Sequence, residues 1–60
     1  MNWIPEENGK VPVYLQIAQK LMAEIEDGTL KEGERLMPER KLSETLHVAR
    51  NTVKQAYEEL

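Results

Sequence analysis

The sequence predicts an all-α fold in which three short helices form a helix-turn-helix. Apolar residues recur at helical spacing in three stretches, and two glycines and a proline separate the first stretch from the second. The last two stretches are joined by a tight turn, and the last one has a strongly polar outer face. A helix, a tight turn and a polar second helix form the arrangement that places side chains in a DNA groove.

The first helix is expected near residues 12–27. Pro12 suits the first turn of a helix, and Gly28 suits the left-handed residue that commonly follows one. The apolar residues between them predict one stripe that faces a core. The members of this stripe are Tyr14, Ile17, Ala18, Leu21, Met22 and Ile25.

Residues 1–10 are expected to form an N-terminal loop, because they show no periodicity and contain proline, asparagine and glycine. Trp3 and Ile4 are apolar within this polar stretch. They either pack on the nearby surface or contact a further domain. Residues 11–60 then make up the domain itself, in partial form.

A connector follows, and we expect a short extended piece at Glu34–Leu36. Pro38 favours an extended Met37 and starts the second helix, which is expected near residues 38–46. In this helix Leu42 and Leu46 are expected to point inward.

His47 and Val48 make the turn, and the third helix is expected from about Arg50 to Leu60. Histidine tolerates left-handed backbone better than most side chains, so His47 fits a turn residue. A phosphate contact from His47 is the alternative. At 100° per residue one face of the third helix is apolar and is expected to be buried; it consists of Val53, Ala56, Tyr57 and Leu60.

The charge is distributed unevenly along the chain. The formal net charge is −3, which is unfavourable for a protein that binds phosphates. Residues 34–55, however, carry five positive and three negative charges, whereas residues 1–33 carry three positive and six negative. The basic charge therefore lies where the motif needs it, although so weak a field predicts modest non-specific affinity.

Composition argues against several other classes of protein. There is no cysteine, so we expect no disulfide and no Cys/His zinc site, and His47 has no partner for a metal or a nucleophile site. The acidic clusters are read as solvated faces, so no catalytic residue is expected. With no membrane-length apolar run and no signal peptide, we expect a soluble cytoplasmic protein that is not an enzyme.

The third helix gathers polar donors near its start. Arginine can bridge the two acceptors of guanine, and asparagine or glutamine can pair with adenine. The helix N-terminus adds N–H groups for a phosphate. From the second helix, Arg40 and Lys41 are placed to contact the flanking sugar-phosphate backbone of the DNA. The alternative is that the polar face is merely solvated and the helices serve for packing or dimerisation.

Several separated motifs, taken in order, resemble the N-terminal winged helix-turn-helix domain of GntR-family bacterial transcription regulators. They are Pro12-Val-Tyr-Leu-Gln-Ile-Ala, Ile25-Glu-Asp-Gly-Thr-Leu-Lys-Glu-Gly-Glu-Arg-Leu, Glu39-Arg-Lys-Leu-Ser and Val48-Ala-Arg-Asn-Thr-Val. The resemblance implies three helices followed by a two-stranded wing, and the wing hairpin is expected to be absent from these residues. It also implies a cytoplasmic regulator that binds operator DNA as a homodimer and responds to a small-molecule effector bound outside this segment.

Carried over position by position, the resemblance implies DNA contacts in the last two helices. Arg40 contributes from the second helix, and Asn51 and Gln55 are neighbours of the contacts in the third. The full set of expected DNA-binding residues is Arg40, Arg50, Asn51, Thr52, Lys54 and Gln55.

The chain also departs from the family pattern. Pro38 is displaced by one residue, which leaves the start of the second helix uncertain. His47 replaces the usual turn glycine, and Ala49 replaces the Ser or Thr before the arginine. The loss of that helix cap costs typically about 1 kcal/mol.

Two features look like the branch whose effector domain resembles a pyridoxal-phosphate aminotransferase, called MocR-like. They are Trp3-Ile-Pro and Thr52-Val-Lys-Gln-Ala-Tyr57. Short regulators with a small helical dimerisation domain are the alternative. In this segment we expect no cofactor, and any pyridoxal phosphate would be bound in a missing C-terminal domain.

Overall fold

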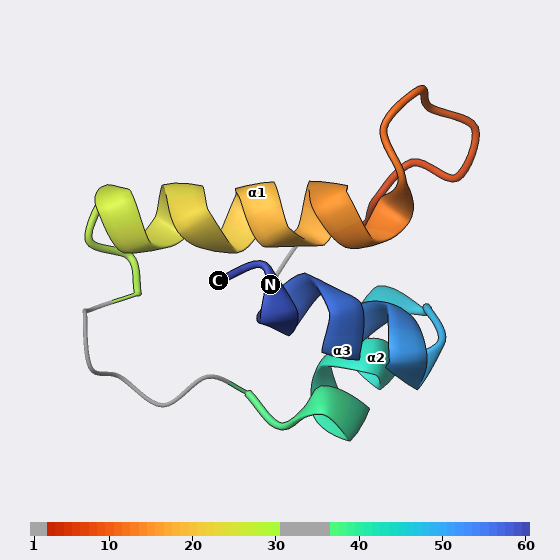
Figure 1. The fold of residues 1–60 in the computed structure, drawn as a ribbon. Helices are drawn as coiled ribbons and strands as arrows, with labels where there is room; N and C mark the ends of the chain where they lie inside the picture. Colours follow the sequence, from red (N-terminus) through yellow and green to blue (C-terminus); the bar gives the residue numbers. More distant parts are fainter. Residues whose placement is uncertain (1–2, 31–36) are drawn as a thin grey trace.

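The computed structural model describes residues 3–30 and 37–60, and these contain three α-helices. They are α1 (Val13–Glu26), α2 (Glu39–Leu46) and α3 (Arg50–Glu58), as Figure 1 shows. Within those two ranges there is no strand. The prediction of an all-α helix-turn-helix core is confirmed, while the extended piece expected at Glu34–Leu36 lies outside the described residues.

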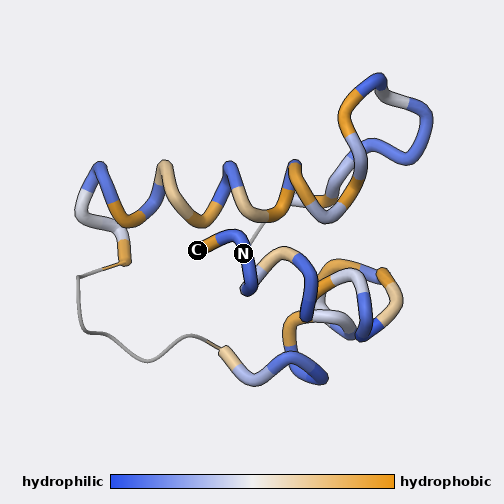
Figure 2. The backbone as a smooth tube through the Cα atoms, in the orientation of Figure 1, coloured by the Kyte–Doolittle hydropathy of each residue, from blue (hydrophilic) through white to orange (hydrophobic). Residues whose placement is uncertain are grey.

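The longest helix, α1, lies across the pair formed by α2 and α3, and α3 contacts both of the others (Figure 1). The apolar residues of α1 lie mainly on the side that faces α2 and α3 (Figure 2), and each of the three helices contributes buried residues to this junction. Because α3 packs in the middle, its orientation is fixed from two directions. The fully buried core residues are Ile17, Ala18, Leu21, Leu42, Leu46, Val53 and Ala56.

Two prolines begin the first two helices from just outside them. Pro12 and Pro38 are both N-cap residues with φ −55° and ψ 145°, so they are extended rather than helical. Their carbonyls accept the first helical hydrogen bonds, from the N–H of Gln16 at 3.1 Å and from the N–H of Leu42 at 3.0 Å. The displaced proline therefore still sets the start of α2, one residue later than expected.

The end of α1 follows the sequence signal. Gly28 has φ +87°, a conformation that glycine adopts without a Cβ clash. The carboxylate of Asp27 accepts a hydrogen bond of 2.8 Å from the N–H of Thr29. Hydrogen bonding from the Thr29 side chain, and after it from the Thr29 N–H, lowers the pKa of Asp27. The helix thus ends where the glycine allows the chain to reverse.

The buried surface is narrower than the apolar stripes predict. Met22 and Ile25 on α1 are each 38% exposed, and Leu60 after α3 is 45% exposed. Only the central residues of each stripe lie against another helix. The expectation that Leu60 is buried is therefore wrong for this structure, as it is for the outer part of the α1 stripe.

The N-terminal segment is anchored to α1 by a glutamine. The side chain of Gln16 accepts a hydrogen bond from the N–H of Glu6 and donates to the carbonyls of Glu6 and Val11, each at 2.8 Å. Trp3 packs against the core, and Lys20 lies 6.0 Å from the centre of its ring. The first alternative, packing on the nearby surface, therefore holds for Trp3.

Candidate nucleic-acid interface

The turn between α2 and α3 depends on one left-handed residue. His47 ends α2 with φ 57° and ψ 44°. The next N–H, of Val48, donates to the carbonyl of Ser43 at 3.1 Å, and the Val48 side chain packs against the core. The expected left-handed histidine is confirmed, and the reversal directs the chain straight into α3.

The start of α3 lacks a side-chain cap. Ala49 is the N-cap residue, with φ −65° and ψ 145°, and no side chain there accepts a hydrogen bond. Its carbonyl accepts from the N–H groups of Thr52 at 3.0 Å and Val53 at 3.4 Å. No serine or threonine hydroxyl at the N-cap therefore accepts a hydrogen bond from the first N–H groups of α3.

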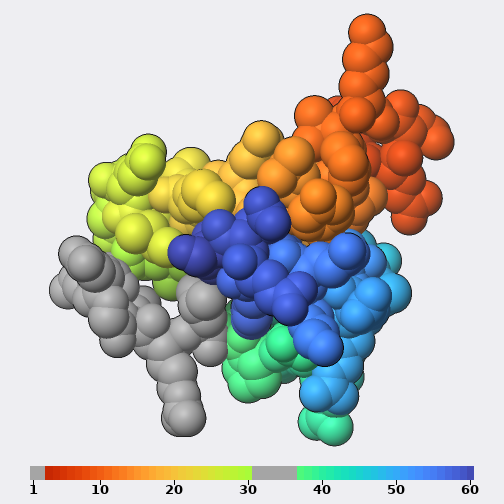
Figure 3. Space-filling view, in the orientation of Figure 1, coloured from red at the N-terminus to blue at the C-terminus, as the bar shows by residue number. Residues whose placement is uncertain are grey.

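Burial divides α3 into an inner and an outer face. Val53 and Ala56 are completely buried, which turns the opposite side of the helix to the surface. Figure 3 shows α3 at the front of the molecule, between α1 and α2. Thr52 is half-buried at the edge of this face. The exposed predicted residues of α3 are Arg50, Asn51, Lys54 and Gln55.

A surface hollow brings three of the predicted residues together. It is lined by Arg50, Asn51, Lys54 and, from the first residue of α2, Glu39. We call these four residues the α3 hollow. An arginine, an amide and a lysine on one shallow surface provide donors suited to both base edges and phosphates.

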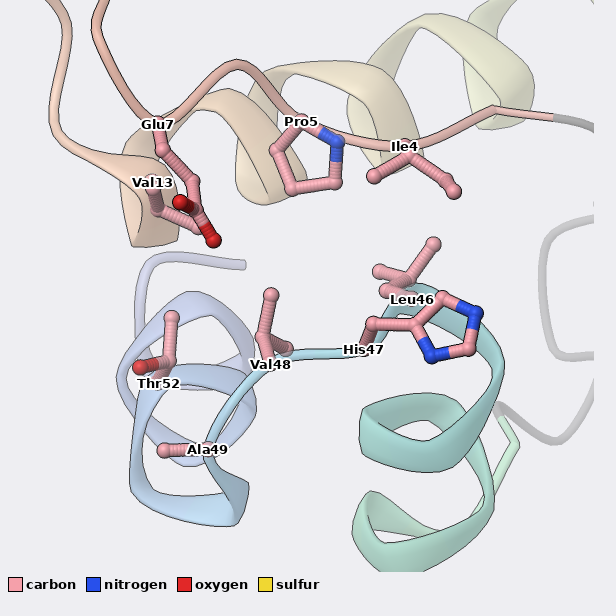
Figure 4. A pocket seen from close by; sticks show the side chains of 9 residues that line it. All are labelled: Ile4, Pro5, Glu7, Val13, Leu46, His47, Val48, Ala49 and Thr52. Atoms are coloured by element: carbon pink, nitrogen blue, oxygen red, sulfur yellow. The ribbon is translucent and has the colours of Figure 1, made fainter.

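Thr52 lies apart from the α3 hollow. It lines a second hollow, together with residues of the turn and of the N-terminal segment (Figure 4). There Ile4 and Pro5 lie across from Leu46 and Val48. The structure therefore separates Thr52 from Arg50, although the two residues are close in sequence.

Both arginines predicted to contact DNA are paired with glutamates of α2. Arg50 Nε lies 3.7 Å from Glu39 Oε1, and Arg40 Nε lies 3.9 Å from Glu44 Oε1. Exposed ion pairs contribute only about 0–1 kcal/mol, because water screens them. Both contacts are longer than a hydrogen bond, so neither occupies an N–H donor that its arginine needs to bind another anion.

Tyr57 connects α3 to the segment that leads into α2. Its hydroxyl donates a hydrogen bond to the carbonyl of Met37. Burial raises the pKa of Tyr57, and the negative charge of Glu39 raises it further. Glu39 therefore lies close enough to influence both Tyr57 and Arg50.

Reasoning from the sequence missed Glu39 as part of this surface. In the sequence it is an acidic residue in the first turn of a helix, where it suits the helix dipole. It stands eleven positions before Arg50, across the turn, and no local pattern joins the two. The family motif that contains Glu39 was the one available signal.

None of the helices in residues 3–30 and 37–60 has both the length and the apolar character to cross a lipid bilayer.

Comparison with known proteins agrees with this geometry. Residues 13–60 match the family described as bacterial regulatory proteins, gntR family. The chain is 40% identical over 52 residues to the HTH-type transcriptional regulator SmoD of Agrobacterium fabrum (strain C58 / ATCC 33970). It is 44% identical over 55 residues to the probable rhizopine catabolism regulatory protein MocR of Rhizobium meliloti. No solved structure matches the chain.

These matches cover most of this chain but a small part of each relative. They span 87% and 92% of the chain, and 22% of SmoD and 11% of MocR. In this chain the family match includes all three helices and the turn between the last two. The chain belongs to the GntR family of bacterial regulatory proteins.

Proposed function

We propose that this chain reads operator DNA for a bacterial transcription regulator, with α3 in the major groove. The observation that carries the proposal is the α3 hollow, where Arg50, Asn51 and Lys54 meet on the exposed face of a helix held from behind by two others. Recognition helices contact base edges through residues near their N-terminal end. Family membership supports the same assignment.

Each predicted residue has a role that its chemistry allows. Arg50 bridges the acceptors of a guanine, and Asn51 pairs with an adenine or a nearby phosphate. Lys54, one turn later, contacts phosphate or guanine, while Gln55 continues the base-reading face. Thr52, at the half-buried edge of α3, and Arg40, on α2, contact the DNA backbone, which sets the position of α3 in the groove.

The wider protein is proposed to be a cytoplasmic homodimer whose effector binds outside this segment. Two copies of α3 would then read two half-sites about one helical turn apart. The relatives named above are regulators that extend well beyond the matched part, which supports a further domain in this protein as well. The similarity to MocR supports the MocR-like branch.

We propose that no pyridoxal phosphate is bound by this segment. The cofactor needs a lysine for its Schiff base and a site that shields it from water. The hollow beside the turn has no lysine in its lining, and Lys54 lies on an exposed face among the residues proposed to read DNA. If this protein uses the cofactor, we propose that a C-terminal domain binds it.

The test is Arg50→Ala in the full-length protein. A consensus duplex is first selected from randomised double-stranded DNA with the wild-type protein. Loss of a bidentate guanine contact is expected to weaken binding to that duplex by about 1–3 kcal/mol.

Lys10→Ala serves as the control, because Lys10 is exposed on the N-terminal segment and its removal also deletes one positive charge. It is expected to leave affinity for the consensus nearly unchanged. Equal losses from both substitutions would mean that only net charge matters. Unchanged binding by both Arg50→Ala and Arg40→Ala would contradict the proposal and favour a packing or dimerisation role.

A further inference from the structure

The α3 hollow contains a carboxylate on a surface proposed to face DNA. Glu39 lies beside Arg50, Asn51 and Lys54. A negative charge close to the phosphates opposes binding, because affinity for DNA depends largely on neutralising phosphates. If this surface binds DNA, Glu39 must also make a favourable contribution to recognition that offsets its repulsion of the phosphates.

The ion pair of Glu39 and Arg50 is asymmetric in burial. The Glu39 side chain is 33% exposed, whereas the Arg50 side chain is 68% exposed. The carboxylate therefore sits at the base of the pair, and the guanidinium reaches outward. At 3.7 Å the Oε1–Nε contact is longer than a hydrogen bond, so it does not itself occupy an N–H donor of Arg50.

The backbone that carries Glu39 is held from behind by α3. Met37, two residues earlier, accepts the hydrogen bond of the Tyr57 hydroxyl, and Pro38 between them is restricted in φ. Tyr57 and Arg50 belong to the same helix. The distance from Glu39 to Arg50 is therefore set by the packing of α2 on α3 and not by a flexible loop.

The other arginine of the interface offers a useful contrast. Arg40 and Glu44 are both on α2, four residues apart, and their side chains are 80% and 66% exposed. Both side chains are free to move in water, so this pair restricts its arginine little.

We propose that Glu39 is a positioning residue for Arg50. Its carboxylate faces Nε and holds the guanidinium so that the terminal amino groups point out of the hollow toward a guanine. Glu39 thereby raises discrimination between guanine and other bases, at the cost of some general affinity for DNA. The inference rests on the proposed function, because it requires Arg50 to read a base.

The test compares Glu39→Gln with Glu44→Gln in the full-length protein. Each substitution removes one negative charge from α2 and keeps the length of the side chain. The probes are the selected consensus duplex and the same duplex with the guanine read by Arg50 replaced by adenine. The measured quantity is the ratio of the two dissociation constants.

Glu39→Gln is expected to lower this discrimination ratio by roughly threefold to tenfold, as for residues that act through a contact. Glu44→Gln is expected to leave the ratio at the wild-type value. Both variants are expected to bind non-cognate DNA somewhat more tightly, because a charge that repels phosphate is gone. Combined with Arg50→Ala, Glu39→Gln is expected to have no further effect on the ratio.

An unchanged ratio for Glu39→Gln, with tighter binding to every duplex, would overturn the proposal and leave Glu39 as a repulsive charge. If Glu39→Gln does not fold, Glu39→Asp replaces it, since it keeps the charge but withdraws it from Arg50. It is expected to lower the ratio as well, and a wild-type ratio would again overturn the proposal. Failure of the DNA-reading function itself is distinct, because Arg50→Ala would then leave the ratio unchanged.

Discussion

His47 holds the turn between α2 and α3 in a left-handed conformation that a residue with a Cβ adopts at a cost. Its φ of 57° and ψ of 44° lie in the region where glycine has no steric penalty. Glycine, the usual residue of the family at this position, adopts this conformation at a lower cost. Histidine is tolerated because its neighbours, the buried Leu46 and the partly buried Val48, hold the turn from both sides.

His47→Gly is therefore expected to stabilise the domain. Relief of the left-handed strain outweighs the entropy that glycine adds to the unfolded chain, and the net gain is up to about 1 kcal/mol. Urea denaturation measures it as a higher midpoint. His47→Ala keeps the Cβ and serves as the control, which is expected to show no gain. A lower midpoint for His47→Gly than for His47→Ala would show that the imidazole itself stabilises the turn.

The sequence predicts which residues of α3 could contact DNA, but it does not predict which residue of α2 lies beside them. Arg50, Asn51 and Lys54 stand out in the sequence because long donors cluster near a helix start. Their convergence with Glu39 depends on how α2 crosses α3, which sequence spacing does not contain. The three hydrogen bonds of Gln16 to the N-terminal segment were equally hidden, since a glutamine on a polar face reads as solvated.

At the scale of the helices, the sequence predicted positions well and contacts less well. All three helix starts lie within one residue of expectation, because prolines and the turn mark them. The ends of α1 and α2 follow from Gly28 and His47. The exposed outer edge of the α1 stripe was not predictable, because periodicity gives the direction of a face but not the width of the helix that covers it.

The contact between α2 and α3 depends in part on Tyr57. Tyr57→Phe removes the hydroxyl that bonds to the Met37 carbonyl and is expected to lower the free energy of unfolding by about 1 kcal/mol. Thermal unfolding followed by circular dichroism measures this loss. Tyr14→Phe is the matched control, because Tyr14 is also half-buried against the core but lies on α1. Equal losses of unfolding free energy in the two variants would show that the hydrogen bond from Tyr57 to Met37 adds no particular stability.

The same residue predicts a dependence of stability on alkaline pH. Burial first, and the charge of Glu39 second, raise the pKa of Tyr57 above its ordinary value of 10.0. In the unfolded chain the phenol loses its proton near pH 10, while the folded protein still retains it. The stability from this group is therefore complete below pH 10 and is lost as pH rises through the folded pKa. Tyr57→Phe is expected to flatten that part of the profile, and an identical decline in both proteins would contradict the assignment.

For the whole molecule, the small core and the uneven charge act together. In the residues that the structure describes, seven buried apolar side chains hold three helices, so a short chain presents a defined surface with little interior. The net charge of −3 resides mostly outside α2 and α3, on α1 and in the N-terminal segment. The fold thus separates an acidic scaffold from the surface that carries the arginines, which is compatible with the proposed binding of DNA.

A position-resolved selection of DNA asks whether the α3 face reads bases. Wild-type, Arg50→Ala and Lys10→Ala forms of the full-length protein are each used to select from randomised double-stranded DNA. If Arg50 reads a guanine, Arg50→Ala is expected to lose its preference at one guanine in each half-site and to keep the remainder of the consensus, while Lys10→Ala selects the wild-type consensus. An Arg50→Ala protein that selects the complete wild-type consensus would contradict base reading by Arg50.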